Sequence, residues 1–77
     1  MTSYNLARFD FVSIRLVVLC AQTGSLTAAA LGCSLVLPAA SRRIRDLEAN
    51  IGELLFERHS RGLRPTSAGR AFVKHGL

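Results

Sequence analysis

The sequence predicts a small, mainly α-helical domain that carries one β-hairpin. Before Gly24 and again before Gly52, apolar residues recur at steps of three and four, which places them on one face of a helix. After Gly52, two short runs of strand-forming residues enclose Ser60-Arg61-Gly62, a combination typical of a turn. The 77 residues make one small domain at most, and a chain of this size buries only about 60% of its unfolded surface.

The first helix is predicted to run from Asp10, a good N-cap residue, to about Thr23. Gly24 ends it, as a glycine just after the last helical turn commonly does. The apolar face that we expect to be buried consists of Phe11, Ile14, Val17, Val18 and Ala21.

A second, short helix is predicted from Leu26 to about Leu31, with Ser25 as its N-cap. Gly32 ends this helix, and Cys33-Ser34-Leu35 connects it to the next one. A short connection that contains glycine is typical of a helix-turn-helix, although many small helical bundles also have one.

The longest helix is predicted to begin near Val36 and to end at Gly52. Pro38 fits only in its first turn, where the missing N–H costs nothing. The helix is expected to bury Ala40, Ile44, Leu47 and Ile51 and to expose Pro38, Arg42 and Arg45, with Ser41 at the edge between the two faces. Together with the preceding helix it forms a predicted helix-turn-helix.

The segment after Gly52 predicts a hairpin and a final helix. Strands are expected at Leu55 to Arg58 and at Leu63 to Pro65, where proline ends the second strand. Thr66 then caps a helix from Ser67 to Leu77, whose apolar face is Ala68, Ala71 and Phe72. The predicted fold class is therefore mainly α: a winged helix-turn-helix with a three-helix core, a two-stranded β wing and a helix that we expect to continue in a longer protein.

The charge favours an anionic partner. Ten Lys and Arg against five Asp and Glu give a net charge of +5, and nine of the ten basic residues are Arg. Eight of the ten lie from Arg42 onward, so the positive charge is concentrated in the C-terminal half. Arginine binds phosphate and guanine bidentately, which favours DNA. General solubility and attraction to another polyanion, including anionic lipid, remain open on charge alone.

Several other classes of function find no support in the sequence. It contains no paired carboxylates at useful spacing, no Ser/His/Asp or Cys/His grouping and no phosphate-cradling glycine loop, so we expect neither an enzyme nor a cofactor. Cys20 and Cys33 lack a zinc-binding pattern and are predicted to be small core residues, with a redox-sensing thiol as the alternative. Neither a signal peptide nor a membrane span is expected, which predicts a cytoplasmic protein.

Several motifs closely resemble the N-terminal DNA-binding domain of LysR-type transcriptional regulators. They are Gly24-Ser25-Leu26-Thr27-x-Ala29-Ala30, Pro38-Ala39-Ala40-Ser41-Arg42-x-Ile44-x-x-Leu47-Glu48, Ile51-Gly52-x-x-Leu55-Phe56-x-Arg58 and Leu63-x-Pro65-Thr66-x-Ala68-Gly69. They follow the family's order and spacing from Asp10 to about Lys74, which is nearly the whole chain.

The resemblance implies a bacterial regulator that binds double-stranded DNA as a homodimer. Residues 1–77 would form one DNA-binding domain, with a core at about 10–66 and the start of a dimerisation linker helix at 67–77. A small-molecule effector would bind only to a C-terminal domain that lies outside this chain. The alternative is a winged-helix module that binds another protein and has weak or no affinity for DNA.

The residues expected to contact DNA lie on the long helix, on the wing and at the start of the second helix. Pro38, Ser41 and Arg42 are expected to face the major groove, and Arg61 and Arg64 the backbone or the adjacent minor groove. Thr27 is a further candidate, and so is Arg45 unless a neighbouring acid such as Asp46 or Glu48 pairs with it. Arg43 is expected either to brace a neighbouring element or to stay solvated, and Arg58 to position the wing.

The chain departs from the family just before the helix proline. Most members carry Ser or Thr followed by Gln there, whereas this chain has Val36 and Leu37. The usual hydroxyl cap is missing, at a cost of about 0.5–2 kcal/mol unless another group satisfies those N–H groups. Leu37 either makes apolar contact with DNA, for example with a thymine methyl, or packs into the rim of the core.

Overall fold

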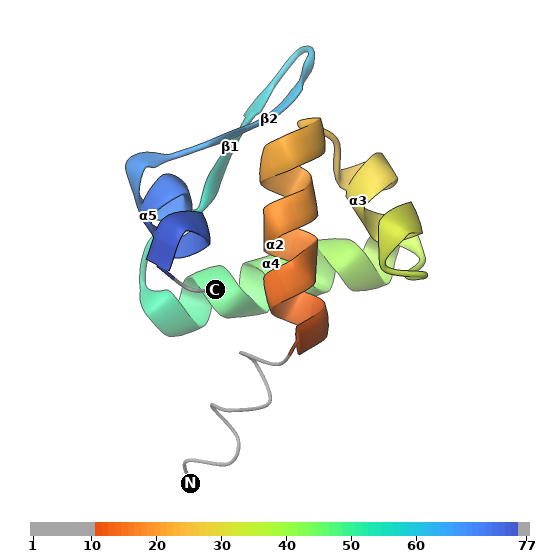
Figure 1. The fold of residues 1–77 in the computed structure, drawn as a ribbon, viewed down its shortest axis with the longest axis horizontal. Coiled ribbons are helices and arrows are strands. Elements are labelled where there is room, and N and C mark those ends of the chain that lie inside the picture. The colour runs from red at the N-terminus through yellow and green to blue at the C-terminus, as the bar shows by residue number, and fades with distance from the viewer. Residues whose placement is uncertain (1–10, 76–77) are drawn as a thin grey trace, which may run out of the picture.

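The computed structural model describes residues 11–75, and its elements follow the predicted order (Figure 1). The elements are α2 (Phe11–Thr23), α3 (Leu26–Gly32), α4 (Leu37–Ile51), β1 (Phe56–His59), β2 (Gly62–Pro65) and α5 (Ser67–His75). The winged helix-turn-helix is confirmed. The predicted N-cap Asp10 and the last two positions of the predicted final helix, 76–77, lie outside the described residues.

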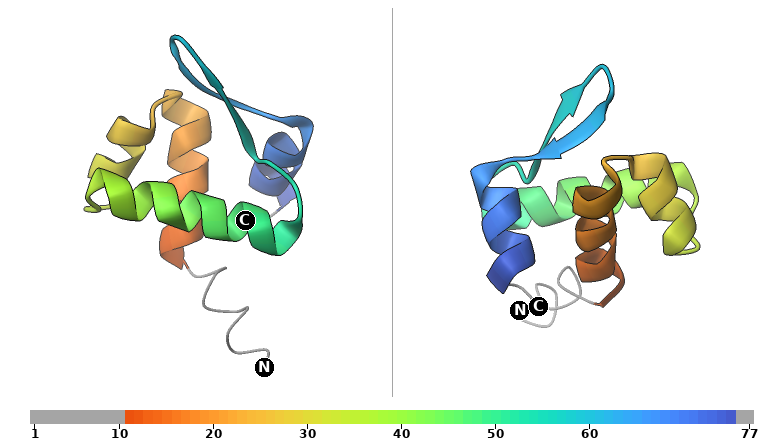
Figure 2. Two further views of the ribbon diagram at one scale, coloured as in Figure 1. Left: turned by 180° about the vertical axis from the view of Figure 1, so that it is seen from behind. Right: turned by 45° about the horizontal axis from the view of Figure 1, so that its top comes forward.

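Helix α2 is the centre of the domain, since it contacts α3, α4, α5 and β2. It crosses α4, with α3 and α5 on its two sides, while the wing projects beyond the helices (Figures 1 and 2). The buried core consists of Leu16, Val17, Cys20, Ala29, Ala30, Ala40, Ile44, Leu47, Leu55 and Phe56. No helix within residues 11–75 is long and apolar enough to span a membrane.

The predicted buried face of α2 is partly wrong. Val17 is buried as expected, but Phe11 is 88% exposed, and Ser13, Leu16 and Cys20 form the rest of the buried face. Nine of the 13 residues of this helix are apolar, so its periodicity defines no single face. Packing against α3 and α4 determines which of its residues are buried.

The predicted ends of α3 and α4 are confirmed by their caps. Ser25 Oγ accepts a hydrogen bond of 3.0 Å from the backbone N–H of Ala28, as an N-cap residue does. Helix α4 begins without a side-chain cap at Val36, holds its proline in the first turn and ends at Gly52, whose φ is +88°. On α4, Ala40, Ile44 and Leu47 are buried as predicted, whereas Ile51 lies at the exposed edge.

The predicted hairpin and the cap of α5 are also confirmed. The strands pair antiparallel from Phe56 opposite Pro65 to His59 opposite Gly62, so β1 lies one residue later than predicted. Thr66 Oγ1 accepts a hydrogen bond of 3.0 Å from Gly69 N–H at the start of α5. On α5, Ala68 and Phe72 are partly buried, but Ala71 is exposed because Gly69 and Val73 face the core instead.

Burial raises the pKa of the Cys20 thiol to about 11, and the nearby Cys33 adds to the shift. Cys20 is fully buried, so the prediction of a small core residue is confirmed. A raised pKa keeps the thiol protonated and weakens it as a nucleophile, which weighs against a redox-sensing role.

The raised pKa makes the free energy of unfolding depend on pH. The pKa of Cys20 in the folded state lies above its ordinary value of 9.0. The stabilisation of the folded state that comes from the protonated thiol is therefore complete below pH 9 and is lost as pH rises through about 11. We expect the free energy of unfolding to fall with a slope approaching about 1.4 kcal/mol per pH unit in this window. Urea denaturation of the wild type and of Cys20→Ala at several pH values measures it; an equal slope in both proteins would contradict the assignment.

Candidate nucleic-acid interface

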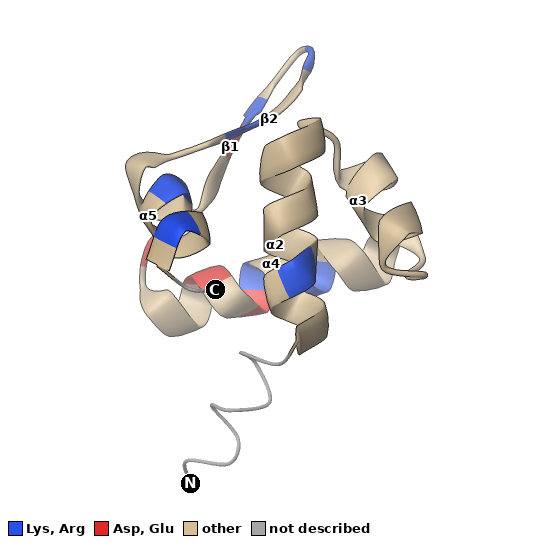
Figure 3. Ribbon diagram, in the orientation of Figure 1, with Lys and Arg blue, Asp and Glu red and all other residues tan. Residues whose placement is uncertain are grey.

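The exposed face of α4 carries the residues that the sequence predicts there. Pro38, Arg42 and Arg45 are exposed, and Ser41 is half-buried at the edge of the face. In the left view of Figure 2, which is turned by 180° from Figure 1, α4 is the element nearest the viewer and the wing rises above it. One side of the domain therefore presents both elements. Basic residues mark α4, both arms of the wing and α5 (Figure 3).

A first hollow, which we call the wing groove, lies between the start of α3, the first turn of α4 and the wing. Residues 24–27, Leu37 and the wing residues 58, 59 and 61–63 line it. The structure thus brings together Thr27, Leu37 and Arg61, which are far apart in the sequence. Their shared location makes this groove a candidate site for a phosphate backbone.

A second hollow, which we call the helix–strand groove, lies between the middle of α4 and β1. Its lining includes Ser41, Arg45, Glu48 and Arg58 together with apolar residues such as Leu26 and Leu63. Arg58 lines both grooves and therefore stands between them. Pro38 and Arg42 lie on the exposed face of α4 but line neither groove.

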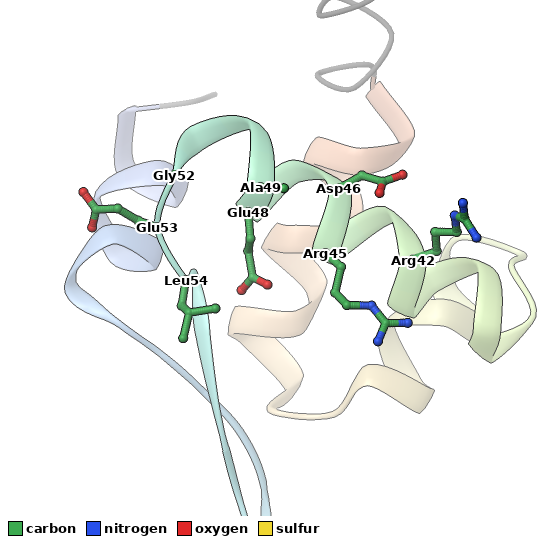
Figure 4. Close-up of a pocket in the computed structure, with 8 residues that line it drawn as sticks. All are labelled: Arg42, Arg45, Asp46, Glu48, Ala49, Gly52, Glu53 and Leu54. Atoms are coloured by element: carbon green, nitrogen blue, oxygen red, sulfur yellow. The ribbon is translucent and has the colours of Figure 1, made fainter.

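Arg45 is not neutralised by the acids near it. Figure 4 shows a shallow hollow along the C-terminal half of α4, in which Glu48 extends toward the wing, whereas Arg45 and Asp46 each point in another direction. No ion pair or hydrogen bond of the Arg45 side chain is present within residues 11–75, so the alternative that Asp46 or Glu48 pairs with it is wrong. The charge of Arg45 is therefore available to a ligand.

The carboxylate of Glu48 instead binds the backbone at the base of the wing. Its Oε2 accepts hydrogen bonds from the backbone N–H groups of Leu55 at 2.8 Å and Phe56 at 3.3 Å. The sequence analysis missed this role, because a contact across seven or eight residues leaves no periodic signal. One carboxylate thus fixes the start of β1 to the last turns of α4.

The other arm of the wing is tied to the turn between α2 and α3. The backbone N–H of Leu63 donates a hydrogen bond of 2.8 Å to the carbonyl oxygen of Gly24. Gly62, whose φ is +131°, lies so close to that carbonyl that a Cβ atom would overlap it. Both arms of the wing are therefore anchored, one to α4 and one to the end of α2.

Two arginines differ from the others in what they contact. Arg43 Nη1 donates a hydrogen bond of 3.1 Å to Ser13 Oγ, so of the alternatives left open for Arg43 the structure shows the one in which it braces a neighbouring element. For Arg58 the sequence predicts a positioning role, but its exposed side chain makes no hydrogen bond or ion pair in the part of the chain that the structure describes. Its place between two grooves makes Arg58 a candidate ligand contact that the sequence analysis missed.

The pleat of the wing separates its arginines. Arg58 lies opposite Leu63, and Arg64 lies opposite Glu57, so Arg58 and Arg64 project to opposite faces of the hairpin. Arg61, in the turn, lines the wing groove together with Arg58. Arg64 instead borders a hollow beside the start of α5, so the structure does not bring Arg61 and Arg64 together in one groove.

Comparison with curated proteins finds transcriptional regulators. A family model described as bacterial regulatory helix-turn-helix protein, lysR family, matches residues 11–70. The chain is 40% identical over 65 residues to the HTH-type transcriptional regulator TfdS of Cupriavidus pinatubonensis, covering 84% of this chain and 22% of that protein. It is 44% identical over 60 residues to the HTH-type transcriptional regulator CbbR of Xanthobacter flavus, covering 78% of this chain and 18% of that protein. The chain thus spans about a fifth of the length of these relatives.

Comparison with solved structures finds the same fold in complexes with DNA. The structure matches the crystal structure of the CbnR_DBD–DNA complex with a TM-score of 0.78 and 34% identity, covering 84% of this chain and 75% of that chain. It matches the BenM_DBD/catB site 1 DNA complex with a TM-score of 0.75 and 33% identity, covering 82% of this chain and 68% of that chain. The relatives are regulators, in agreement with the prediction that the chain is not an enzyme.

Removal of the Glu48 carboxylate is expected to destabilise the domain. Glu48→Ala leaves two partly buried backbone N–H groups without an acceptor, at a cost of about 1–3 kcal/mol in the free energy of unfolding. Glu48→Gln is expected to lose less, since its amide oxygen still accepts hydrogen bonds. Urea denaturation measures the effect, with Glu53→Ala as a control that removes an exposed carboxylate of the same charge. Equal stability of Glu48→Ala and Glu53→Ala would contradict this role.

Proposed function

The chain belongs to the lysR family of bacterial regulatory helix-turn-helix proteins, and we propose that it binds double-stranded DNA as part of a transcriptional regulator. The observation that carries the proposal is the set of exposed arginines on one side of the domain, around the wing groove and the helix–strand groove. Arg42, Arg45, Arg58 and Arg61 have no protein partner within residues 11–75. Phosphates supply the negative charge that such a surface lacks.

In this proposal α4 enters the major groove by its exposed face. Ser41 donates a hydrogen bond to a phosphate, and Arg42 reaches a phosphate or the edge of a guanine. Arg45 adds a contact from the next turn of the helix. Pro38 and Leu37, in the first turn, approach the bases without a side-chain donor or acceptor.

The wing and the start of α3 hold the DNA backbone beside that groove. A DNA strand crosses the wing groove of the protein, and Thr27 and Arg58 contact its phosphates. Arg61, in the turn, reaches toward the adjacent minor groove of the DNA. Arg64 contributes less, because it projects from the other face of the hairpin opposite Glu57. This division among the wing arginines rests on the register of the hairpin.

We further propose that this domain is one part of a longer, dimeric regulator. Helix α5 continues into a linker that pairs two copies of the domain, and a separate C-terminal domain binds a small-molecule effector. The relatives are about five times as long as the matched segment, which leaves room for such parts in a protein of this family. The regulator acts in the cytoplasm, where bacterial DNA is found.

The proposal predicts DNA binding that weakens with salt and depends on specific arginines. Binding of the chain to a fluorescent A·T-rich duplex is expected to fall with salt by a slope equivalent to about 3–6 phosphates. Arg42→Ala, Arg58→Ala and Arg61→Ala are each expected to lower that slope by about one, because each removes a phosphate contact. Fluorescence anisotropy across a salt series measures the slope.

Arg15→Ala and Arg64→Ala are the matched controls, since each removes the same charge. Arg15 is exposed on α2 and lines neither groove. The slope is expected to change little in both controls. Equal effects of all five substitutions would mean that net charge alone attracts DNA. Absence of binding at low salt by the folded chain, and by a copy of it fused to an unrelated dimer, would instead favour a module that binds protein.

A further inference from the structure

The exposed start of the recognition helix α4 is apolar. Val36 is 71% exposed and Leu37 is 45% exposed, and the exposed Pro38 follows them. The N-cap makes no side-chain hydrogen bond, and none of these three side chains carries a donor or an acceptor. The side chains at the tip of the helix therefore present only methyl and methylene groups, and the exposed part of Leu37 is open to a ligand.

This apolar tip lies in a basic environment. Leu37 lines the wing groove together with Arg58 and Arg61, and Arg42 follows one turn later on the exposed face of α4. An uncharged apolar partner would leave these cations desolvated without a counter-charge. The surface instead fits a ligand that carries negative charge and presents small apolar groups beside that charge.

Duplex DNA has that combination of groups in its major groove. Thymine is the only standard base whose major-groove edge carries a methyl group, at C5, and phosphates flank it on both sides of the groove. Leucine and valine contact a methyl group by van der Waals packing and gain from excluding water from it.

We infer that the first turn of α4 recognises the C5-methyl group of thymine through Leu37, with Val36 beside it, and does not read hydrogen-bonding groups of the bases. The inference rests on the proposed DNA-binding function and adds the chemistry by which the tip of α4 selects a base. It implies that 5-methylcytosine is accepted where thymine is, since both carry the same methyl group. It also implies that uracil is disfavoured at that position.

The test exchanges single methyl groups in the DNA. A preferred duplex is selected from a random pool with the wild-type chain, and each thymine is then replaced in turn by deoxyuridine, which lacks only the C5-methyl group. At one or two positions of a binding site we expect the affinity to fall about fourfold, the value of one buried methyl group. A duplex with 5-methyldeoxycytidine at that position, paired with guanine, is expected to bind the chain more tightly than the same duplex with unmethylated deoxycytidine.

Variants of the chain assign the effect to the tip of α4. In Leu37→Ala, thymine and deoxyuridine duplexes are expected to bind with nearly equal affinity, and Val36→Ala is expected to reduce the difference. Leu31→Ala is the matched control, because Leu31 is 81% exposed at the end of α3 and lines neither groove. This control is expected to keep the full difference. Circular dichroism of each variant checks that the domain remains folded.

The outcomes separate the inference from the function on which it rests. If the wild-type chain and its fusion to an unrelated dimer select no duplex and bind none, the proposed DNA binding fails. If it binds DNA but no thymine shows a methyl effect, or if Leu37→Ala and Val36→Ala both keep that effect, DNA binding stands and methyl recognition by the first turn of α4 is overturned.

Discussion

The carboxylate of Glu48 joins the recognition helix to the wing, and the geometry of the proposed interface depends on that contact. Two backbone N–H groups at the start of β1 donate to one oxygen of this side chain. On the other arm, the N–H of Leu63 donates to the carbonyl of Gly24, and a glycine at position 62 permits the close approach. The Glu48 carboxylate and one backbone hydrogen bond therefore set the position of the wing relative to the helices and, with it, the width of the grooves.

Because backbone groups and one carboxylate hold the wing, the arginines around the grooves are not needed for the fold. Arg43 is the exception on α4, since it reaches back to Ser13 on α2. Arg42, Arg45 and Arg58 have no internal partner among residues 11–75 and stay exposed. Unpaired cations on one surface raise the local potential and attract a polyanion at long range. The division between structural and free arginines therefore suits the proposed binding of DNA.

Local signals in the sequence were enough to predict most of the fold. Ser25, Gly52 and Thr66 act on groups within a few residues, so the predicted ends of the helices agree with the structure. The buried face of α2 was not predictable, because its apolar residues surround the helix and tertiary packing chooses among them. The opposite directions of Arg58 and Arg64 depend on hairpin register, and the role of Glu48 depends on a contact between two elements.

The most direct test of the central claim, that α4 and the wing form one DNA-binding surface, is a map of amide chemical shifts during titration with a duplex. Nuclear magnetic resonance suits a chain of 77 residues. We expect the largest changes at residues 24–27, in the first half of α4 and at residues 58–63 of the wing, all saturating together. Changes concentrated on α5 or on the exposed face of α2, with α4 and the wing unaffected, would contradict the claim.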